Sequence, residues 1–401
     1  MKRTCGLDVH KETIFCATFD GKVHSPVLEY TTLTCSIRSM GDELKRMGVQ
    51  SVAMESTGMY WIPVWNIIEE MGFELILVNP FLIKQMPGRK SDVKDAQWIA
   101  TLLHKGLLRG SLVPCPDIRE LRTYSRKYIK LQQQKTSVLQ DMERTLEMCS
   151  IRITSFVSNI SGKSVIRVIE KIIQGETTAE LLVELIHGRI VNSHKRETII
   201  ESLKGHVTEH HRFILELALQ QFTLLNNQID QCLEKMEKMC HEHYQKELNL
   251  LKTITGISDI SAMIIIAETG ADMKAFESSA KFSGWTGLRP RNDESAGKFK
   301  STATTKGNRF FRAVLVQVAW AASRTKGSYF KEKFNRLAIR KPRKKALIAI
   351  ARKIAVIVWN VLEHNQEYDP RKLPVYDPIK LQAKLAYHQK ETNRIENLIK
   401  R

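Results

Sequence analysis

The spacing of apolar and polar positions divides the first eighty residues into short strands and helices. Asp20-Gly21 between two apolar runs is typical of a hairpin turn. Three consecutive strands followed by alternating helix and strand predict a mixed α/β layer. The expected strands lie at 5–10, 13–19, 23–30, 51–54 and 75–78, and the expected helices at 36–47 and 60–71.

Two aspartates follow the last of these strands in an unusual position. Asp92 and Asp95 are three residues apart, so they lie on one face of a helix for which Ser91 is a good N-cap. Ile99 and Leu102 continue the same stripe toward the C-terminus. The stripe therefore faces a core, and carboxylates that point into a core need a metal ion or another cation as a partner.

Two further acids sit on predicted strands of the same layer. Asp8 lies within the first strand and Glu55 ends the fourth. In an α/β sheet, strand ends of this kind converge on one crevice. Each acid alone fits an ordinary solvated surface position, but four gathered carboxylates require divalent cations, and their hard oxygen atoms suit Mg²⁺ or Mn²⁺. A carboxylate site that holds two metal ions is typical of phosphoryl transfer.

Residues 118–250 change to a helical pattern without proline. Near-heptad spacing of apolar residues predicts two long paired helices that form, in part, a coiled coil. The span 151–211 is interrupted by glycines and is expected to be an insertion in this helical arm. Three arginines of the first helix either follow a phosphate backbone or belong to an ordinary solvated face: Arg119, Arg122 and Arg126.

The last third of the chain is helical and strongly basic. Ile254 to Ile266 resembles a helix-hairpin-helix segment, in which a glycine turn presents backbone N–H groups to phosphate. Apolar helices are expected at 310–322 and 347–361, and the polar tail from residue 363 is expected to be peripheral.

Charge narrows the class of partner. The 401 residues carry a net charge of +19, while 43% hydrophobic and 26% charged residues are ordinary for a globular protein. Residues 281–353 hold 20 Lys and Arg against 3 Asp and Glu, which favours contact with nucleic acid. The candidate contacts are Arg289, Arg291, Lys298, Lys306, Arg309, Arg312, Arg343 and Lys344.

Two further features of the sequence concern the membrane and the location of the protein in the cell. No apolar run approaches the length of a membrane span, so we expect no membrane partner. Seven cysteines without a CxxC pair predict reduced thiols and a cytoplasmic location.

Ser295 is a candidate nucleophile within the basic segment. It is expected in a flexible polar loop, 292–298, with arginine and lysine nearby in sequence. A serine hydroxyl needs a base or a metal to activate it, and cations stabilise a phosphoryl transition state. Composition alone favours an unreactive loop serine. On chemistry alone, several neighbouring hydroxyls are as eligible as Ser295: Ser301, Thr302, Thr304 and Thr305.

The order of motifs resembles that of the DEDD insertion-sequence transposases, also called bridge-RNA-guided recombinases. The N-terminal motifs are GLDVHK (6–11), MESTGMYW (54–61), NP (79–80) and KSDVKDA (90–96). The C-terminal motifs follow in the same order: TGIS, GWTGLRPR, ESAGK and TKGNRFFR. The resemblance covers about residues 4–360, but it does not extend to a family motif within 151–211.

The resemblance implies a RuvC-like, RNase H-fold N-terminal domain whose DEDD tetrad is Asp8, Glu55, Asp92 and Asp95. It also implies a catalytic Ser295, which forms a covalent link to DNA, and Mg²⁺ (or Mn²⁺) at the carboxylates. The implied partners are DNA at the element ends and the target, a structured guide (bridge) RNA, and further copies of the chain, as a dimer that assembles into a tetramer. The serine of one subunit would complete the carboxylate site of another.

Four regions are expected from these patterns together. They are a RuvC-like domain at 1–110, a helical coiled-coil dimerisation region at 111–250, a mostly helical transposase domain at 251–362 and a tail at 363–401. Two other functions stay open: a RuvC-like junction nuclease that uses water, and a nucleic-acid-binding protein with an inactive scaffold. Ser295→Ala distinguishes a transposase with a serine nucleophile from the first alternative, because a nuclease that uses water would still hydrolyse DNA.

Overall fold

A computed structural model gives the arrangement of the chain. It describes residues 3–55, 58–79, 92–108, 110–291, 293–295, 298–301, 303–372 and 378–399. The chain divides into two compact units, Met1–Pro114 and Cys115–Arg401. Among the described residues, no helix is both long enough and apolar enough to cross a membrane.

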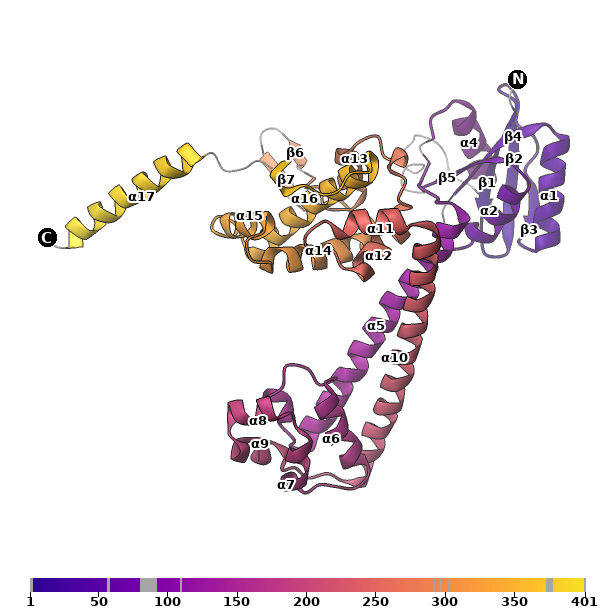
Figure 1. Ribbon diagram of the computed structural model, residues 1–401. Helices are drawn as coiled ribbons and strands as arrows, with labels where there is room; N and C mark the ends of the chain where they lie inside the picture. Colours follow the sequence, from indigo (N-terminus) through magenta and orange to yellow (C-terminus); the bar gives the residue numbers. More distant parts are fainter. Residues whose placement is uncertain are drawn as a thin grey trace. The chain divides into compact units, whose positions relative to one another are not determined.

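The first unit contains a mixed five-stranded sheet, as the alternating pattern predicts (Figure 1). The strand order is β3-β2-β1-β4-β5; β1 pairs antiparallel with β2, and parallel with β4. The elements are β1 (Arg3–Val9), β2 (Thr13–Phe19), β3 (Leu28–Thr31), α1 (Thr34–Arg46), β4 (Val49–Glu55), α2 (Trp61–Glu70), β5 (Glu74–Val78) and α4 (Asp92–His104).

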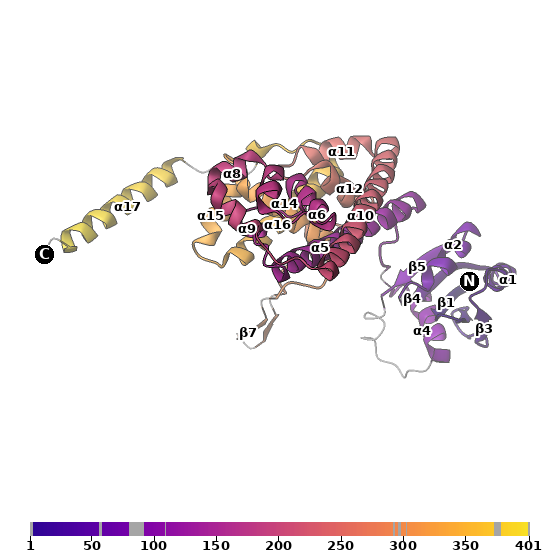
Figure 2. The ribbon, with the colours of Figure 1, turned by 90° about the horizontal axis from the view of Figure 1, so that it is seen from below.

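Helices cover both faces of this sheet, and Figure 2 shows α4 on the side opposite α1 and α2. Cys5, Leu7 and Val9 of β1 join the buried core that includes Ile37 of α1 and Ile68 of α2. The alternate residues of β1 face α4, because successive side chains of a strand point to opposite faces. The face that α4 covers therefore holds the even-numbered positions of β1, and Asp8 is one of them.

The second unit begins with the predicted pair of long helices. Figure 1 shows α5 (Pro116–Met148) and α10 (Glu209–His243) side by side, with a small helical group at their far end. That group occupies the predicted insertion, and its core is continuous with the core between the two long helices. Its elements are η1 (Ile153–Ser155), α6 (Lys163–Ile173), α7 (Ala179–Leu182), η2 (Val183–Leu185), α8 (Gly188–His194) and α9 (Arg196–Leu203).

A helical body with one small hairpin follows the arm. Buried residues of α12, α14 and α16 form its interior, including Ile265, Leu315 and Ile354. The elements are α11 (Gln245–Lys252), α12 (Asp259–Thr269), η3 (Met273–Ala275), α13 (Ser279–Trp285), β6 (Asp293–Ser295), β7 (Lys298–Ser301), α14 (Arg309–Arg324), α15 (Tyr329–Ala338), α16 (Arg343–His364), η4 (Pro370–Lys372) and α17 (Pro378–Ile399).

The glycine turn predicted at the helix-hairpin-helix segment connects α11 and α12. Gly256 has a φ of +94°, and a Cβ at this position would lie 2.7 Å from the Val318 carbonyl oxygen and 2.9 Å from the Ala322 Cβ of α14. Glycine is therefore required for both its backbone conformation and the close approach of this turn to α14. The turn has a packing role that the sequence pattern alone did not indicate.

Candidate active site and serine hairpin

The approach of α4 to β1 determines where the carboxylates lie. A Cβ at Gly6 would be 2.2 Å from the Ala96 carbonyl oxygen and 2.6 Å from the Ala100 amide nitrogen, so only glycine allows the two backbones this close. The Thr4 hydroxyl donates a hydrogen bond of 3.0 Å to the Ala100 carbonyl oxygen. These contacts fix the register of the helix on the strand.

This register brings the first turn of α4 toward Asp8. Two strand residues advance about 6.6 Å and one helical turn about 5.4 Å, so the two elements stay nearly in step. Thr4 lies beside Ala100 and Gly6 beside Ala96, so α4 runs antiparallel to β1. One further step along β1 reaches Asp8, and one further turn back along α4 reaches its beginning, where Asp92 and Asp95 lie.

Glu55 occupies the matching position on the neighbouring strand. In the parallel pair, Gly6 lies opposite Ala53 and Leu7 opposite Met54, so the next position along places Asp8 alongside Glu55. Ala53 packs with Ile99 of α4 and Val78 of β5, which shows that this face of β4 also lies under α4. Asp8 and Glu55 thus share one face at the carboxyl ends of adjacent parallel strands.

The environments of the acids differ. Asp8 is 6% exposed, and Glu55 and Asp95 are half-buried. Asp92 begins α4, and its side chain is outside the described part of the structure, as is Ser91, the predicted N-cap. Among the described side chains, no group of three histidine, cysteine or acidic residues has a metal-binding arrangement.

His10 is a neighbour of the site that the sequence patterns did not single out. Its Nε2 atom lies 3.3 Å from the Asp8 Oδ2 atom, and its ring packs edge-on against Phe15, 5.9 Å between centroids. The available signal was strand alternation, since positions 8 and 10 share a face.

Ser295 ends a β-strand rather than lying in the flexible loop that its polar neighbours predicted. Strands β6 and β7 form an antiparallel pair in which Ser295 lies opposite Lys298. Cross-strand pairing explains the difference, because the hairpin is stabilised by hydrogen bonds that composition does not reveal. The positions of β6 and β7 are described by their backbone, except for Ser301, whose side chain is also described.

Two segments form a paired stem below the hairpin. The Arg291 amide donates to the Ala303 carbonyl (2.9 Å), and the Thr305 amide donates to the Arg289 carbonyl (2.9 Å). At the base, a Cβ on Gly307 would lie 2.2 Å from the Gly287 amide nitrogen, so this pair of glycines allows the chains to cross closely. Figure 2 shows β7 projecting from the helical body.

The alternative hydroxyls near Ser295 take part in local structure. The Ser301 hydroxyl accepts a hydrogen bond from the Ala303 amide (3.2 Å), and the Thr305 hydroxyl donates to the Gly284 carbonyl (3.3 Å). Thr304 forms an isolated bridge with Pro290 through its backbone. Thr302 lies outside the described residues.

Two of the predicted phosphate contacts on α5 have partners inside the protein. Arg122 donates to the Ala267 and Glu268 carbonyls at the end of α12 (3.0 and 2.8 Å), and burial lowers the pKa of its guanidinium. Arg126 forms a bidentate pair with the Glu268 carboxylate. Both arginines therefore have a packing role, which the prediction of phosphate contacts did not include, whereas Arg119 is half-buried.

Most of the remaining basic candidates are accessible. Arg312 is half-buried, and the side chain of Lys298 is outside the described part. The exposed candidates are Arg289, Arg291, Lys306, Arg309, Arg343 and Lys344.

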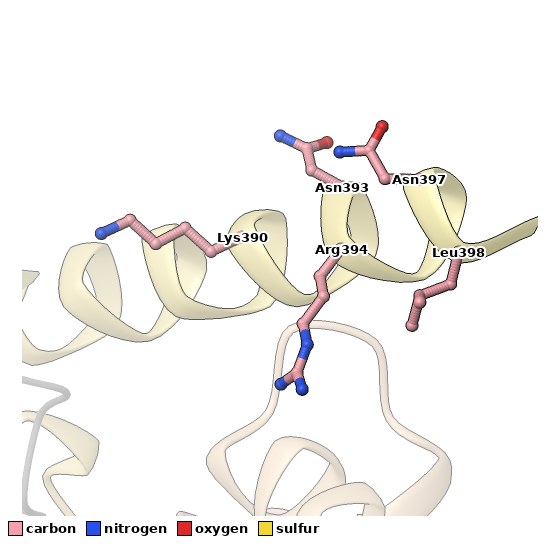
Figure 3. A pocket seen from close by; sticks show the side chains of 5 residues that line it. All are labelled: Lys390, Asn393, Arg394, Asn397 and Leu398. Carbon is pink, nitrogen blue, oxygen red and sulfur yellow. The ribbon is translucent and has the colours of Figure 1, made fainter. Parts of the chain in front are cut away.

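A surface hollow of about 650 Å³ on α17 offers no comparable chemistry. Figure 3 shows its lining side chains, all from this one helix and without an acidic group: Lys390, Asn393, Arg394, Asn397 and Leu398.

Comparison with known proteins agrees with this arrangement of motifs. Residues 5–151 match a transposase family model of the DEDD, IS110 type, and residues 248–335 match the model described as "Transposase IS116/IS110/IS902 family". Together the two matches span more than half of the chain. The chain is a DNA-processing enzyme of the transposase class, and DNA is its partner. It belongs to the IS110 family of DEDD insertion-sequence transposases.

Individual relatives carry similar descriptions. The chain is 23% identical over 328 residues to a "Probable family 20 transposase" of Pseudomonas aeruginosa, which covers 80% of this chain and 86% of the relative. It is 29% identical over 159 residues to a Sinorhizobium fredii protein that is by name a transposase, y4pF/y4sB, with 37% of this chain and 39% of the relative covered.

Proposed function

We propose that this transposase cleaves, exchanges and rejoins DNA strands through a covalent serine–DNA intermediate at Ser295, assisted by Mg²⁺ at a RuvC-like DEDD site. The observation that carries the proposal is the shared face of Asp8 and Glu55 under the first turn of α4. A nearly buried carboxylate beside a second one is costly without a cation.

The donor set fits a hard divalent cation. Asp8, Glu55, Asp92 and Asp95 would hold Mg²⁺ or Mn²⁺ through oxygen atoms alone. When bound, such ions stabilise the charge that develops on a scissile phosphate and favour deprotonation of a nucleophile. His10, 3.3 Å from the Asp8 carboxylate, would help to orient that carboxylate.

Ser295 would supply the nucleophile. Its Oγ atom loses its proton and bonds to phosphorus, while a sugar oxygen leaves and takes up a proton. The new phosphoserine ester conserves the phosphodiester bond energy, so rejoining needs no external energy source. Exposed Arg289 and Arg291 on the hairpin stem would neutralise the phosphate backbone near this position.

The proposal also includes a guide RNA and an assembly of several copies of the chain. A structured guide RNA would pair with target and donor DNA, and the arm of α5 and α10 would form a dimerising coiled coil within a tetramer. The carboxylates of one subunit would act with the serine of another, so that cutting is confined to assembled complexes. The accessible basic residues of the second unit supply the charge that a nucleic-acid partner requires.

A water-using nuclease is the second candidate, because the Asp8–Glu55 face belongs to the first unit alone and needs no serine. Purified protein, its RNA and junction DNA would be incubated with Mg²⁺ and separated on a denaturing gel. We expect a protein–DNA adduct that is lost in both Ser295→Ala and Asp8→Asn. Cleavage without an adduct, unchanged in Ser295→Ala, would replace the proposal with the nuclease.

A further inference from the structure

A fully buried carboxylate lies at the base of the serine hairpin. Glu268, near the C-terminal end of α12, is 0% exposed. It accepts hydrogen bonds from Arg126 Nε (2.8 Å) and Nη2 (2.9 Å), and from Asn308 Nδ2 (2.6 Å). Three hydrogen-bond donors, two of them on a cation, satisfy the buried charge, and Arg122 Nε lies 3.7 Å from the same carboxylate, so its removal leaves these partners unmatched.

The partner Asn308 is where the hairpin stem ends and α14 begins. Its Oδ1 atom accepts hydrogen bonds from the Phe310 and Phe311 amides (3.0 and 3.1 Å), which makes it the N-cap of α14. Its own backbone amide donates to the Trp285 carbonyl, which lies just before the other segment of the stem (3.1 Å). One residue thus joins both segments of the stem to a helix.

The chemistry of Asn308 makes its orientation unambiguous. The amide donates to a carboxylate on one side and accepts from helix N–H groups on the other, and an aspartate at this position could only accept. Glu268 therefore selects the orientation in which Asn308 caps α14. Arg126 adds a second constraint, since its guanidinium also stacks on the Phe310 ring at 4.5 Å from the centroid.

The stem transmits this constraint toward Ser295. The backbones at Gly287 and Gly307 lie so close at the base that neither position has space for a side chain, and two backbone hydrogen bonds connect the segments above it. From Arg291, the last paired position of that side of the stem, Ser295 is four residues away in sequence.

We propose that Glu268 is a positioning residue for the serine hairpin: through Asn308 and Arg126 it holds the hairpin in the orientation that presents Ser295 for reaction. This inference rests on the proposed serine chemistry. A displacement of about 1 Å at a reacting group costs about 100-fold in rate, so disorder at the base lowers adduct formation without removing the nucleophile.

The test uses a reciprocal exchange of the two partners in the full-length chain. Asn308→Asp keeps an N-cap for α14 but sets two carboxylates against each other. Glu268→Gln removes the charge, and the double variant restores one amide facing one carboxylate with the total charge unchanged. Asp259→Asn is the matched control, because it removes a salt bridge with Lys252 (2.6 Å) at the other end of the same helix.

Adduct formation is measured as a rate per folded protein, beside DNA binding and hydrogen exchange at the Thr305 amide. We expect Asn308→Asp to lower the rate about 100-fold and to raise exchange at Thr305, with DNA binding retained. The double variant should form the adduct at least about tenfold faster than Asn308→Asp, which corresponds to about 1.4 kcal/mol in activation free energy. Asp259→Asn should match the wild type.

Two results would overturn the positioning role. One is a double variant no faster than Asn308→Asp; the other is a loss of adduct that only follows the folded fraction. If the wild type forms no adduct, the proposed serine chemistry fails instead. Hydrogen exchange at Thr305 then still decides whether Glu268 orders the stem, because that readout does not depend on catalysis.

Discussion

Gly6→Ala tests the backbone contact that brings α4 to the carboxylate face. The added methyl would lie 2.2 Å from the Ala96 carbonyl oxygen, 2.6 Å from the Ala100 amide nitrogen and 2.9 Å from the Ile99 Cβ atom. All three belong to the backbone or the Cβ of a packed helix, so no flexible side chain can move aside. The strand and the helix must separate by about 1 Å.

The magnitude follows from the cost of overpacking. Extra methyl groups in a packed core cost about 1–3 kcal/mol, and a clash with backbone belongs at the upper end, about 3 kcal/mol. For a unit of this size, about 4 °C of melting temperature per kcal/mol gives a fall of about 12 °C for the unfolding of the first unit. Asp92 and Asp95 move with α4, so metal-dependent activity should fall as well.

Differential scanning calorimetry of the full chain measures the transition, and hydrogen exchange of the Ala96 to Ala100 amides reports on α4 itself. Gly110→Ala is the control in the same unit, since its Cβ would meet only the Ile76 Cγ2 atom, at 3.4 Å. A Gly6→Ala variant that melts within about 2 °C of the control would refute the close approach of α4 to β1.

Two further predictions concern charge. Asp8→Asn should abolish the rise in melting temperature that Mg²⁺ produces, because it removes a carboxylate ligand; calorimetry with and without the ion checks this, and an unchanged response to Mg²⁺ would remove Asp8 from the metal site. Replacing exposed Arg343 and Lys344 with alanine should weaken DNA binding and reduce the slope of log affinity against log salt by about 2; a slope equal to that of the wild type would show that neither touches phosphate.

The sequence predicted the α/β unit well because its strands and helices have strong local periodicity. The alternation in β1 and the apolar run of β4 give both the elements and the face on which Asp8 and Glu55 lie. The pair of long helices was equally predictable from the sequence, since its apolar spacing persists over many turns.

Contacts between distant segments could not be predicted from the sequence in the same way. Arg126 and Glu268 are 142 positions apart in sequence, and nothing in the pattern of α5 distinguishes an arginine that binds phosphate from one that binds a buried carboxylate. The hairpin at Ser295 depends on cross-strand hydrogen bonds, which composition does not report. Only two weak signals pointed to the base of the hairpin: an acid directly after the apolar run of α12, and an asparagine just before α14.

The continuity of α5 gives the molecule a mechanical property. Arg126, which holds the base of the hairpin, and Met148, beside the helical group at the far end, belong to one uninterrupted helix of 33 residues. At 1.5 Å per residue they are about 33 Å apart, so α5 can act as a lever. A rotation of about 5° at Arg126 moves the far end by about 3 Å over that length.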